Sequence, residues 1–305
     1  MGIGRRAVLA GGAGSAALLL AAGRPWAQPG GLIRRAIPST GETVPAIGLG
    51  TAGRYMAAAT EAEVTALRKT LEAFHGEGGT VIDTSDDYGM AEEIVGRLAQ
   101  ELGIRDALFL ATKVSTSGRE AGAQQVELSF KRLRTPRLDL VAVHNLEDAA
   151  TNLRLLRELK QAGRIRYVGV TTSYESQHQP LAALMRREAL DFVQVDFALD
   201  NREAGDRILP LARERGIAVM VNLPLGRGRL FAAVRGKPLP PWAAEFDCAS
   251  WAQFFLKYVV AFEAVTCAIP GMGRPEHVTD NLGAARGRLP DAAMRKRMEA
   301  FIDGL

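Results

Sequence analysis

Short apolar runs alternate with amphipathic stretches along most of the chain. The runs are AIGLG, TVIDT, ALFLATK, LDLVAVHN, YVGVTT, DFVQVD, AVMVNLP and AVTCAIP. Runs that are apolar at successive positions, and not only at alternate ones, are typical of strands in a parallel sheet that is covered on both faces. The stretches between them, such as EAEVTALRKTLEAFHGEG and QQVELSFKRLR, have the helical period of about 3.6 residues. The pattern therefore predicts repeated β/α units.

Eight such units favour a closed barrel over a doubly wound sheet, because no charged or Pro/Gly-rich linker divides the series. Before the first strand, IRRAIPSTGETVP predicts a short hairpin with its turn at residues 39–42. The expected architecture is α/β: a (β/α)8 TIM barrel with an N-terminal β-hairpin, forming a single domain over residues 28–305. The link that follows Pro224 is unusually long, and links of that kind are often functional.

Residues 1–27 have the pattern of an export signal peptide. Arg5 and Arg6 precede a Gly/Ala-rich apolar segment from Ala7 to Ala22, and a small-residue cleavage site follows at Ala27. The arginine pair resembles the twin-arginine class of signals, which the export machinery reads. The expectation is an exported, periplasmic protein with no stable membrane span after cleavage. An uncleaved membrane anchor is the alternative, although the segment is short for a span of about 20 residues.

A dinucleotide-like motif, GAGSAA at residues 12–17, lies inside this segment. No strand precedes it, and the first acidic residue of the chain is Glu42, so a Rossmann reading fails. The formal charge is +4, and the signal segment holds three arginines and no acid, which leaves 4 − 3 = +1 for the rest. That balance does not indicate a nucleic-acid partner. Cys267 lies in an apolar run, which predicts a buried free thiol, but a bond to Cys248 stays open. No Cys/His cluster predicts a metal site.

Titratable side chains fall where three predicted strands end. Asp83 closes TVID, Lys113 closes LFLATK and His144 closes LDLVAVH, while Tyr88 follows in the loop after the first of these strands. In a barrel the carboxyl ends of the strands share one rim, where the chemistry of such folds takes place. Each residue alone has an ordinary structural explanation, such as a helix cap or a solvated strand end. Four on one rim predict an active site.

The order and spacing of these residues resemble the Asp/Tyr/Lys/His tetrad of the aldo-keto reductase superfamily. The resemblance extends from about Pro45 onwards and includes GLGT at 48–51, GRIRYVGV at 163–170, PLGRG at 224–228 and IPG at 269–271. It implies an NADP(H)-dependent oxidoreductase that reduces an aldehyde or ketone to an alcohol, or the reverse. Tyr88 would be the general acid, tuned by Lys113 and Asp83, because a nearby ammonium lowers the pKa of a phenol. His144 would orient the carbonyl.

The resemblance also implies a set of cofactor-binding residues. They are Gly50, Thr51, Thr171, Thr172, Gln194, Asn222, Leu225, Gly226, Arg227, Gly271, Arg274, His277, Asp280 and Asn281. Thr171, Thr172 and Gln194 would meet the carboxamide, and Leu225, Gly226, Arg227 and Arg229 would follow the pyrophosphate. Arg274 would contact a 2′-phosphate, and Asp280 and Asn281 the adenine. Thr172, Asn222 and His277 depart from the usual Asn, aromatic residue and Arg. NADP(H) is favoured over NAD(H).

Two alternatives remain open at this stage. The chain could be a non-catalytic or very slow nicotinamide-binding redox sensor or subunit in the cell envelope, or a barrel scaffold that binds no cofactor. The substrate is a small-molecule carbonyl or alcohol whose identity the sequence does not give. Phe231, Trp242 and Phe246 in the 227–249 segment are candidates either for substrate contacts or for packing within the loop.

Overall fold

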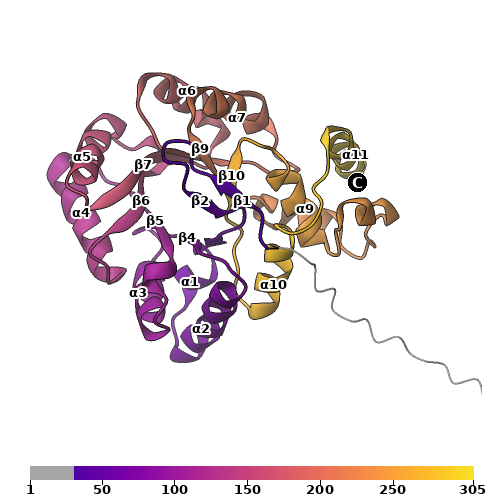
Figure 1. Ribbon diagram of the computed structural model, residues 1–305, viewed down its shortest axis with the longest axis horizontal. Helices are drawn as coiled ribbons and strands as arrows, with labels where there is room; N and C mark the ends of the chain where they lie inside the picture. Colours follow the sequence, from indigo (N-terminus) through magenta and orange to yellow (C-terminus); the bar gives the residue numbers. More distant parts are fainter. Residues whose placement is uncertain (1–30) are drawn as a thin grey trace, which may run out of the picture.

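A curled sheet of eight parallel strands forms the centre of the computed structural model, which describes residues 31–305 (Figure 1). The strands are β3 (Leu49–Gly50), β4 (Val81–Asp83), β5 (Phe109–Val114), β6 (Leu138–Val143), β7 (Ile165–Thr172), β8 (Phe192–Asp196), β9 (Ala218–Asn222) and β10 (Val265–Ala268). Each strand pairs with the next one along the chain, and parallel bridges between Ile47 and Ala268 and between Gly50 and Gly271 join the two ends of the sheet. The (β/α)8 barrel is confirmed. The predicted signal, residues 1–27, lies outside the described residues.

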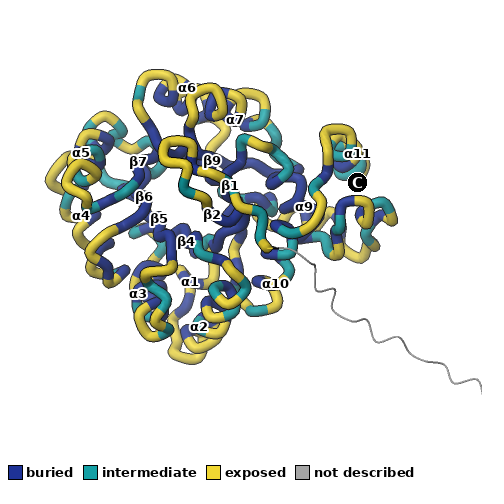
Figure 2. The backbone as a smooth tube through the Cα atoms, viewed as in Figure 1, coloured by how far each residue is buried: buried dark blue, intermediate teal, exposed yellow. Residues whose placement is uncertain are grey.

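Most of the helices surround the sheet and bury their apolar faces against it, whereas α11 lies outside this ring (Figure 1); the strands are dark and the outer helix faces bright in Figure 2. They are α1 (Arg54–Ala57), α2 (Glu61–Gly76), α3 (Ala91–Glu101), α4 (Arg119–Arg132), α5 (Ala149–Gln161), α6 (His178–Arg187), α7 (Glu203–Arg215), α8 (Arg229–Ala233), α9 (Trp251–Val260), α10 (Pro275–Gly283) and α11 (Ala292–Asp303). Short 3-10 turns are η1 (Arg105–Ala107), η2 (His144–Leu146), η3 (Glu175–Gln177), η4 (Gly226–Gly228) and η5 (Pro241–Phe246). Local sequence fixes where helices begin: α2 starts with a capping box between Thr60 and Glu63.

The predicted hairpin closes the end of the barrel where the strands begin. Strands β1 (Arg34–Ala36) and β2 (Thr43–Pro45) pair antiparallel, and Ile37 and Val44 join the buried cluster that contains Phe109, Tyr167 and Phe192. The hydroxyl of Tyr167 hydrogen-bonds Thr40 Oγ1 at 2.8 Å and donates to the Glu42 carboxylate at 2.5 Å. Because this end is filled with side chains, the opposite rim is the place for a site.

The long link after Pro224 is a folded segment and not an open loop. It contains η4, α8 and η5, and Trp242 and Phe246 pack on Phe254 and Phe301 as a second, smaller aromatic core. Phe231 is 41% exposed but lies edge-on to Phe255, with the ring centroids 5.4 Å apart. The packing alternative for these aromatic residues therefore agrees with the structure.

Both cysteines are buried and neither is bonded to the other, which confirms the free thiol expected at Cys267 and settles the pairing that the sequence left open. Burial raises the pKa of the Cys248 thiol to about 12 and also raises the pKa of Cys267. Within residues 31–305 no helix is both long and apolar enough to cross a membrane.

Candidate active site

The buried pair Lys113–Asp83 lies at the centre of the rim. Asp83 ends β4 and Lys113 lies near the end of β5, on adjacent strands of the barrel. The Lys113 ammonium donates to both carboxylate oxygens of Asp83, at 2.8 and 2.9 Å, and to the Thr84 carbonyl at 2.7 Å. The two residues are only 1% and 5% exposed. A charge this deeply buried persists only with an opposite charge and hydrogen bonds around it, and both are present.

Tyr88 and His144 complete the group that the sequence predicted. Lys113 Nζ lies 5.0 Å from the centroid of the Tyr88 ring, and the His144 ring meets Tyr88 edge-on with centroids 6.1 Å apart. The tyrosine reaches this position because Gly89, directly after it, takes a φ of +52°, which L side chains disfavour. The structure thus brings Asp83, Lys113, Tyr88 and His144 together, while their chemical roles stay a prediction.

The electrostatics of Tyr88 differ from the simple expectation that a lysine lowers the pKa of the phenol. The Lys113 charge is the strongest single influence and does lower the pKa of Tyr88, but burial and the negative charge of Asp83 oppose it, and the net pKa lies above the ordinary value. Burial alone would lower the pKa of Lys113, yet Asp83 and Tyr88 outweigh burial and raise it. The phenol therefore keeps its proton, beside a lysine that keeps its charge.

The surroundings of His144 include a carboxylate that the sequence argument did not single out. Asp87 Oδ2 lies 3.2 Å from His144 Nδ1. Burial lowers the pKa of His144 and so does the Lys113 charge, whereas Asp87 and Asp83 act in the opposite direction without reversing the shift. The available signal was the position of Asp87, next to Tyr88 in DTSDDYG.

A cleft of about 540 Å³ opens at this rim. Asp83, Tyr88 and His144 line it, together with eight of the predicted cofactor residues: Gly50, Thr51, Thr171, Gln194, Asn222, Leu225, Arg227 and Gly271. Further lining residues that sequence reasoning missed are Met56, Asn145, Ser173, Tyr174 and Leu223. Gly50 is required where the barrel closes, because a Cβ there would lie 2.7 Å from the Ile269 carbonyl oxygen.

Six predicted cofactor residues lie outside the lining of this cleft: Thr172, Gly226, Arg274, His277, Asp280 and Asn281. Thr172 donates to the Gln177 side chain at 2.5 Å. Asp280 accepts from Ser250 at 2.6 Å and Gln253 at 3.0 Å, and so supports the start of α9. Arg274 is exposed and lies 3.7 Å from Glu276. Arg229, which was expected along the pyrophosphate, also lies outside the lining and is paired with Asp200 at 2.9 Å.

A chain of hydrogen bonds links the far wall of the cleft to the buried pair. Thr171 Oγ1 donates to Gln194 Oε1 at 2.7 Å, and Gln194 Nε2 donates to Asp83 Oδ1 at 2.9 Å. Asn222 uses its Nδ2 for the Thr172 carbonyl at 3.2 Å, but its buried Oδ1 has no partner. An unpaired buried acceptor beside the tetrad fits the amide N–H of a nicotinamide, and the Arg227 cation on the same cleft fits an anionic group. The residues present are compatible with a nicotinamide dinucleotide.

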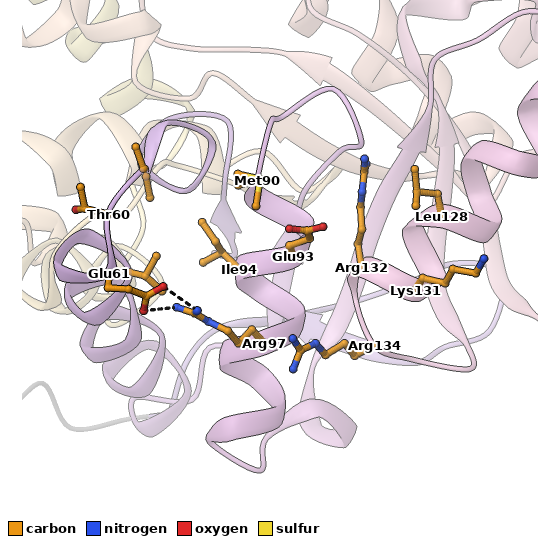
Figure 3. Close-up of a pocket in the computed structure, with 13 residues that line it drawn as sticks. Thr60, Glu61, Met90, Glu93, Ile94, Arg97, Leu128, Lys131, Arg132 and Arg134 are labelled. Atoms are coloured by element: carbon orange, nitrogen blue, oxygen red, sulfur yellow. Dashed lines mark hydrogen bonds and ion pairs between the residues drawn. The ribbon is translucent and has the colours of Figure 1, made fainter.

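A larger cleft of about 720 Å³ lies elsewhere, between α2, α3 and α4 (Figure 3). Two of its charges are matched to each other: Arg97 is hydrogen-bonded to both carboxylate oxygens of Glu61, at 3.0 and 3.1 Å. None of the predicted catalytic residues lines it. This cleft is the larger of the two, but Asp83, Tyr88 and His144 line the smaller cleft at the strand ends. We therefore take the smaller cleft as the candidate active site.

The barrel and its rim define a class of protein: an α/β barrel with acid–base side chains gathered at the carboxyl ends of its strands. The chain belongs to the aldo/keto reductase family, whose sequence model matches residues 46–302. It is therefore an oxidoreductase of the class that acts on alcohol or carbonyl groups.

Individual relatives agree with this assignment. The chain is 34% identical over 211 residues to aldo-keto reductase YhdN of Bacillus subtilis, and the match covers 64% of this chain and 62% of that protein. It is 27% identical to aldo-keto reductase yakc [NADP(+)] of Schizosaccharomyces pombe, over 85% of this chain and 89% of that one. An aldo-keto reductase from Klebsiella pneumoniae, solved in complex with NADPH, superposes with a TM-score of 0.74 at 27% identity, over 89% of this chain and 95% of that chain.

Proposed function

We propose that the protein is an NADP(H)-dependent oxidoreductase that interconverts a small aldehyde or ketone and its alcohol. The observation that carries the proposal is the Lys113–Asp83 pair beneath Tyr88, because a buried ammonium beside a protonated phenol stabilises the phenolate left after proton transfer. The NADP named for the yeast relative and the NADPH bound in the Klebsiella structure support the choice of cofactor.

Each residue of the tetrad has a defined task in this proposal. A bound nicotinamide supplies or takes the hydride. In reduction, Tyr88 Oη gives its proton to the substrate oxygen, where negative charge develops as the carbon accepts hydride. Lys113 lowers the free energy of the resulting phenolate, and Asp83 holds Lys113 charged and in place. His144, whose ring lies edge-on to Tyr88, orients the substrate oxygen.

Two parts of the cleft would hold the cofactor. Asn222 Oδ1 would accept from the carboxamide, and Arg227 would neutralise the pyrophosphate. The further preference for NADP(H) over NAD(H) rests on Arg274, whose guanidinium is exposed and has only a loose ion pair, so it remains open to a 2′-phosphate.

Replacing Tyr88 with Phe tests the function directly. The change removes one hydroxyl and should lower kcat for carbonyl reduction by roughly 10²- to 10⁴-fold, because the proton donor is lost. Fluorescence titrations should show the same Kd for NADPH in both proteins and weaker binding of NADH to each. Wild-type protein that binds NADPH but turns over no carbonyl would favour the redox-sensor alternative, and protein that ignores NADPH would favour the scaffold. Near-normal turnover by the Tyr88→Phe variant would overturn the role of Tyr88.

We further propose that residues 1–27 direct export and are removed, leaving one barrel domain over residues 28–305 in the periplasm. The arginine pair and the small-residue site support this proposal. Twin-arginine export moves folded proteins, so the protein would carry its nucleotide with it. Fractionation, N-terminal sequencing of the mature protein and identification of any bound nucleotide test the three statements separately. A cytoplasmic protein with an intact N-terminus would contradict the first two.

A further inference from the structure

The loop that carries Tyr88 also carries a carboxylate that contacts His144. Asp87 Oδ2 lies 3.2 Å from His144 Nδ1, and the two side chains are 51% and 14% exposed. Asp87 comes directly before Tyr88 in the chain. The same loop therefore places the Tyr88 phenol in the lining of the cleft and the Asp87 carboxylate next to Nδ1 of His144. The family tetrad does not include Asp87.

The charged and titratable groups around His144 come from three elements. Lys113 on β5 and Asp83 on β4 act from below, and Asp87 and Tyr88 act from the loop after β4. Burial and Lys113 lower the pKa of His144 despite the two carboxylates. At neutral pH the ring is therefore uncharged and has a single N–H.

The position of that N–H follows from the partner. An ionised carboxylate only accepts hydrogen bonds, so the ring nitrogen that faces Asp87 must be the one that bears the hydrogen. Nδ1 faces Asp87. In the neutral ring Nε2 then has a lone pair and no hydrogen, and it can accept a hydrogen bond but cannot donate one.

We propose that Asp87 is a positioning residue that fixes the Nδ1–H tautomer of His144 and thereby makes the direction of the reaction sensitive to pH. This rests on the proposed oxidoreductase function. A carbonyl oxygen needs donors, so during reduction His144 helps only when a second proton occupies Nε2. During oxidation Tyr88 must release its own proton before it can accept the hydroxyl proton, and the bare Nε2 of neutral His144 is the base that takes it.

The protons balance in both directions. In reduction the carbon gains a hydride, and the oxygen gains the proton of Tyr88 Oη, which solvent later replaces. The imidazolium of His144 donates a hydrogen bond from Nε2 and keeps both of its protons. Oxidation is the reverse of the same path: the carbon loses a hydride, which a bound nicotinamide would take, and the hydroxyl proton passes to Tyr88 Oη. Tyr88 can accept it because its own proton has moved to the bare Nε2 of neutral His144, and Asp87 stabilises the imidazolium until the extra proton leaves to solvent.

Asp87→Asn is the informative variant. An asparagine amide can turn its N–H₂ towards Nδ1, so the neutral ring can take the Nε2–H form and donate to a carbonyl without extra protonation. In the wild type, kcat/KM for reduction should fall about tenfold per pH unit above the pKa of His144, in line with loss of an essential proton. In the variant this fall should disappear, and alcohol oxidation at alkaline pH should slow.

Asp86→Asn is the matched control. It removes the same charge from the same loop, but Asp86 contacts Ser85, Ser115 and Gln125 and makes no hydrogen bond to His144. Its pH profiles should follow the wild type. Equal flattening by both variants would mean that loop charge alone acts, and would overturn the proposal.

Nitrogen-15 NMR of the histidine rings shows which ring nitrogen bears the hydrogen, and it requires no catalytic turnover. The test of the tautomer is therefore independent of the proposed reaction. The chain has four histidines, and a His144→Gln sample identifies the signals of His144. We expect a protonated Nδ1 and a bare Nε2 in the wild type and the reverse in Asp87→Asn. A wild-type ring protonated at Nε2, or a variant with unchanged nitrogen shifts, would overturn the inference.

Discussion

Two lysines of this barrel are buried to the same degree, and their environments drive them in opposite directions. Lys113 is 1% exposed and Lys257, on α9, is 0% exposed. Lys113 contacts a carboxylate at 2.8 Å, whereas Lys257 donates only to the backbone carbonyls of Arg286 and Arg288, at 2.6 and 2.8 Å. The pKa of Lys113 is raised, and burial lowers the pKa of Lys257 to about 8.

The difference shows what a buried ammonium requires in order to remain charged. Carbonyl groups satisfy its hydrogen bonds but bring only partial charges, and these do not offset the loss of hydration. A full opposite charge does. Lys113 therefore remains a cation beside Tyr88, where it can stabilise a phenolate. Lys257 instead joins α9 to the segment after α10 by hydrogen bonds. Substituting each lysine should therefore affect different properties: activity as well as stability for Lys113, and only stability for Lys257.

The largest effect should come from Lys113→Met. The change removes the cation that stabilises the phenolate and leaves Asp83 buried without a counter-charge. We expect kcat to fall by roughly 10²- to 10⁴-fold, and the free energy of unfolding to fall by about 3–5 kcal/mol. Steady-state kinetics and urea unfolding measure the two losses.

A double variant distinguishes the two losses. Lys113→Met combined with Asp83→Asn removes both charges, so most of the stability should return while the rate stays low. If the double variant regained near-normal activity, the cation would have no part in the chemistry. If it remained as unstable as the single variant, the loss would come from packing and not from an unpaired charge.

Lys257→Met should have a smaller and different effect. The carbonyls of Arg286 and Arg288 lose a common charged donor, and a hydrogen bond to a charged group contributes about 1.5–3 kcal/mol. Activity at room temperature should be unchanged, because Lys257 does not line the rim cleft. Urea unfolding measures the loss of stability and steady-state kinetics measure the activity. A rate loss similar to that of Lys113→Met would contradict the different roles assigned to the two lysines.

The sequence predicted Lys113 and could not predict Lys257, for a physical reason. Lys113 ends an apolar strand, and the parallel arrangement of strands places such ends on one rim, so its location followed from the fold class. Lys257 lies inside the apolar helix SWAQFFLKYVV, where a lysine could equally extend to solvent along its own methylenes. Only tertiary packing decides whether the Lys257 ammonium is buried or reaches solvent.

The same limit applies to contacts between distant segments. Asp280 is expected near adenine, and the sequence did not indicate that it also accepts a hydrogen bond from Ser250, thirty residues earlier in the chain, at the junction of α9 and α10. Asn145 is likewise placed by a turn with an unusual backbone angle, a φ of +47°, and the loop that carries Asp87 turns at Gly89, which has a φ of +52°. The strands and the rim positions of Asp83, Lys113 and His144 follow from periodicity, whereas loop contacts, including those of Tyr88, depend on how particular turns close.

The last expected effect is in the pH dependence of stability, where the two lysines should again differ. The folded-state pKa of Lys257 is about 8, below the ordinary 10.5 of an unfolded chain, so the unfolded state binds more protons between these values. Stability from Lys257 should therefore rise with pH over that interval. Lys113 has a raised pKa, so its contribution is complete below 10.5 and is lost only at higher pH. The difference in unfolding free energy between wild type and Lys257→Met isolates this rise from cysteine and tyrosine titration. A difference that stays constant from pH 7.5 to roughly 10 would show that Lys257 keeps its proton, and that two carbonyls can replace a carboxylate.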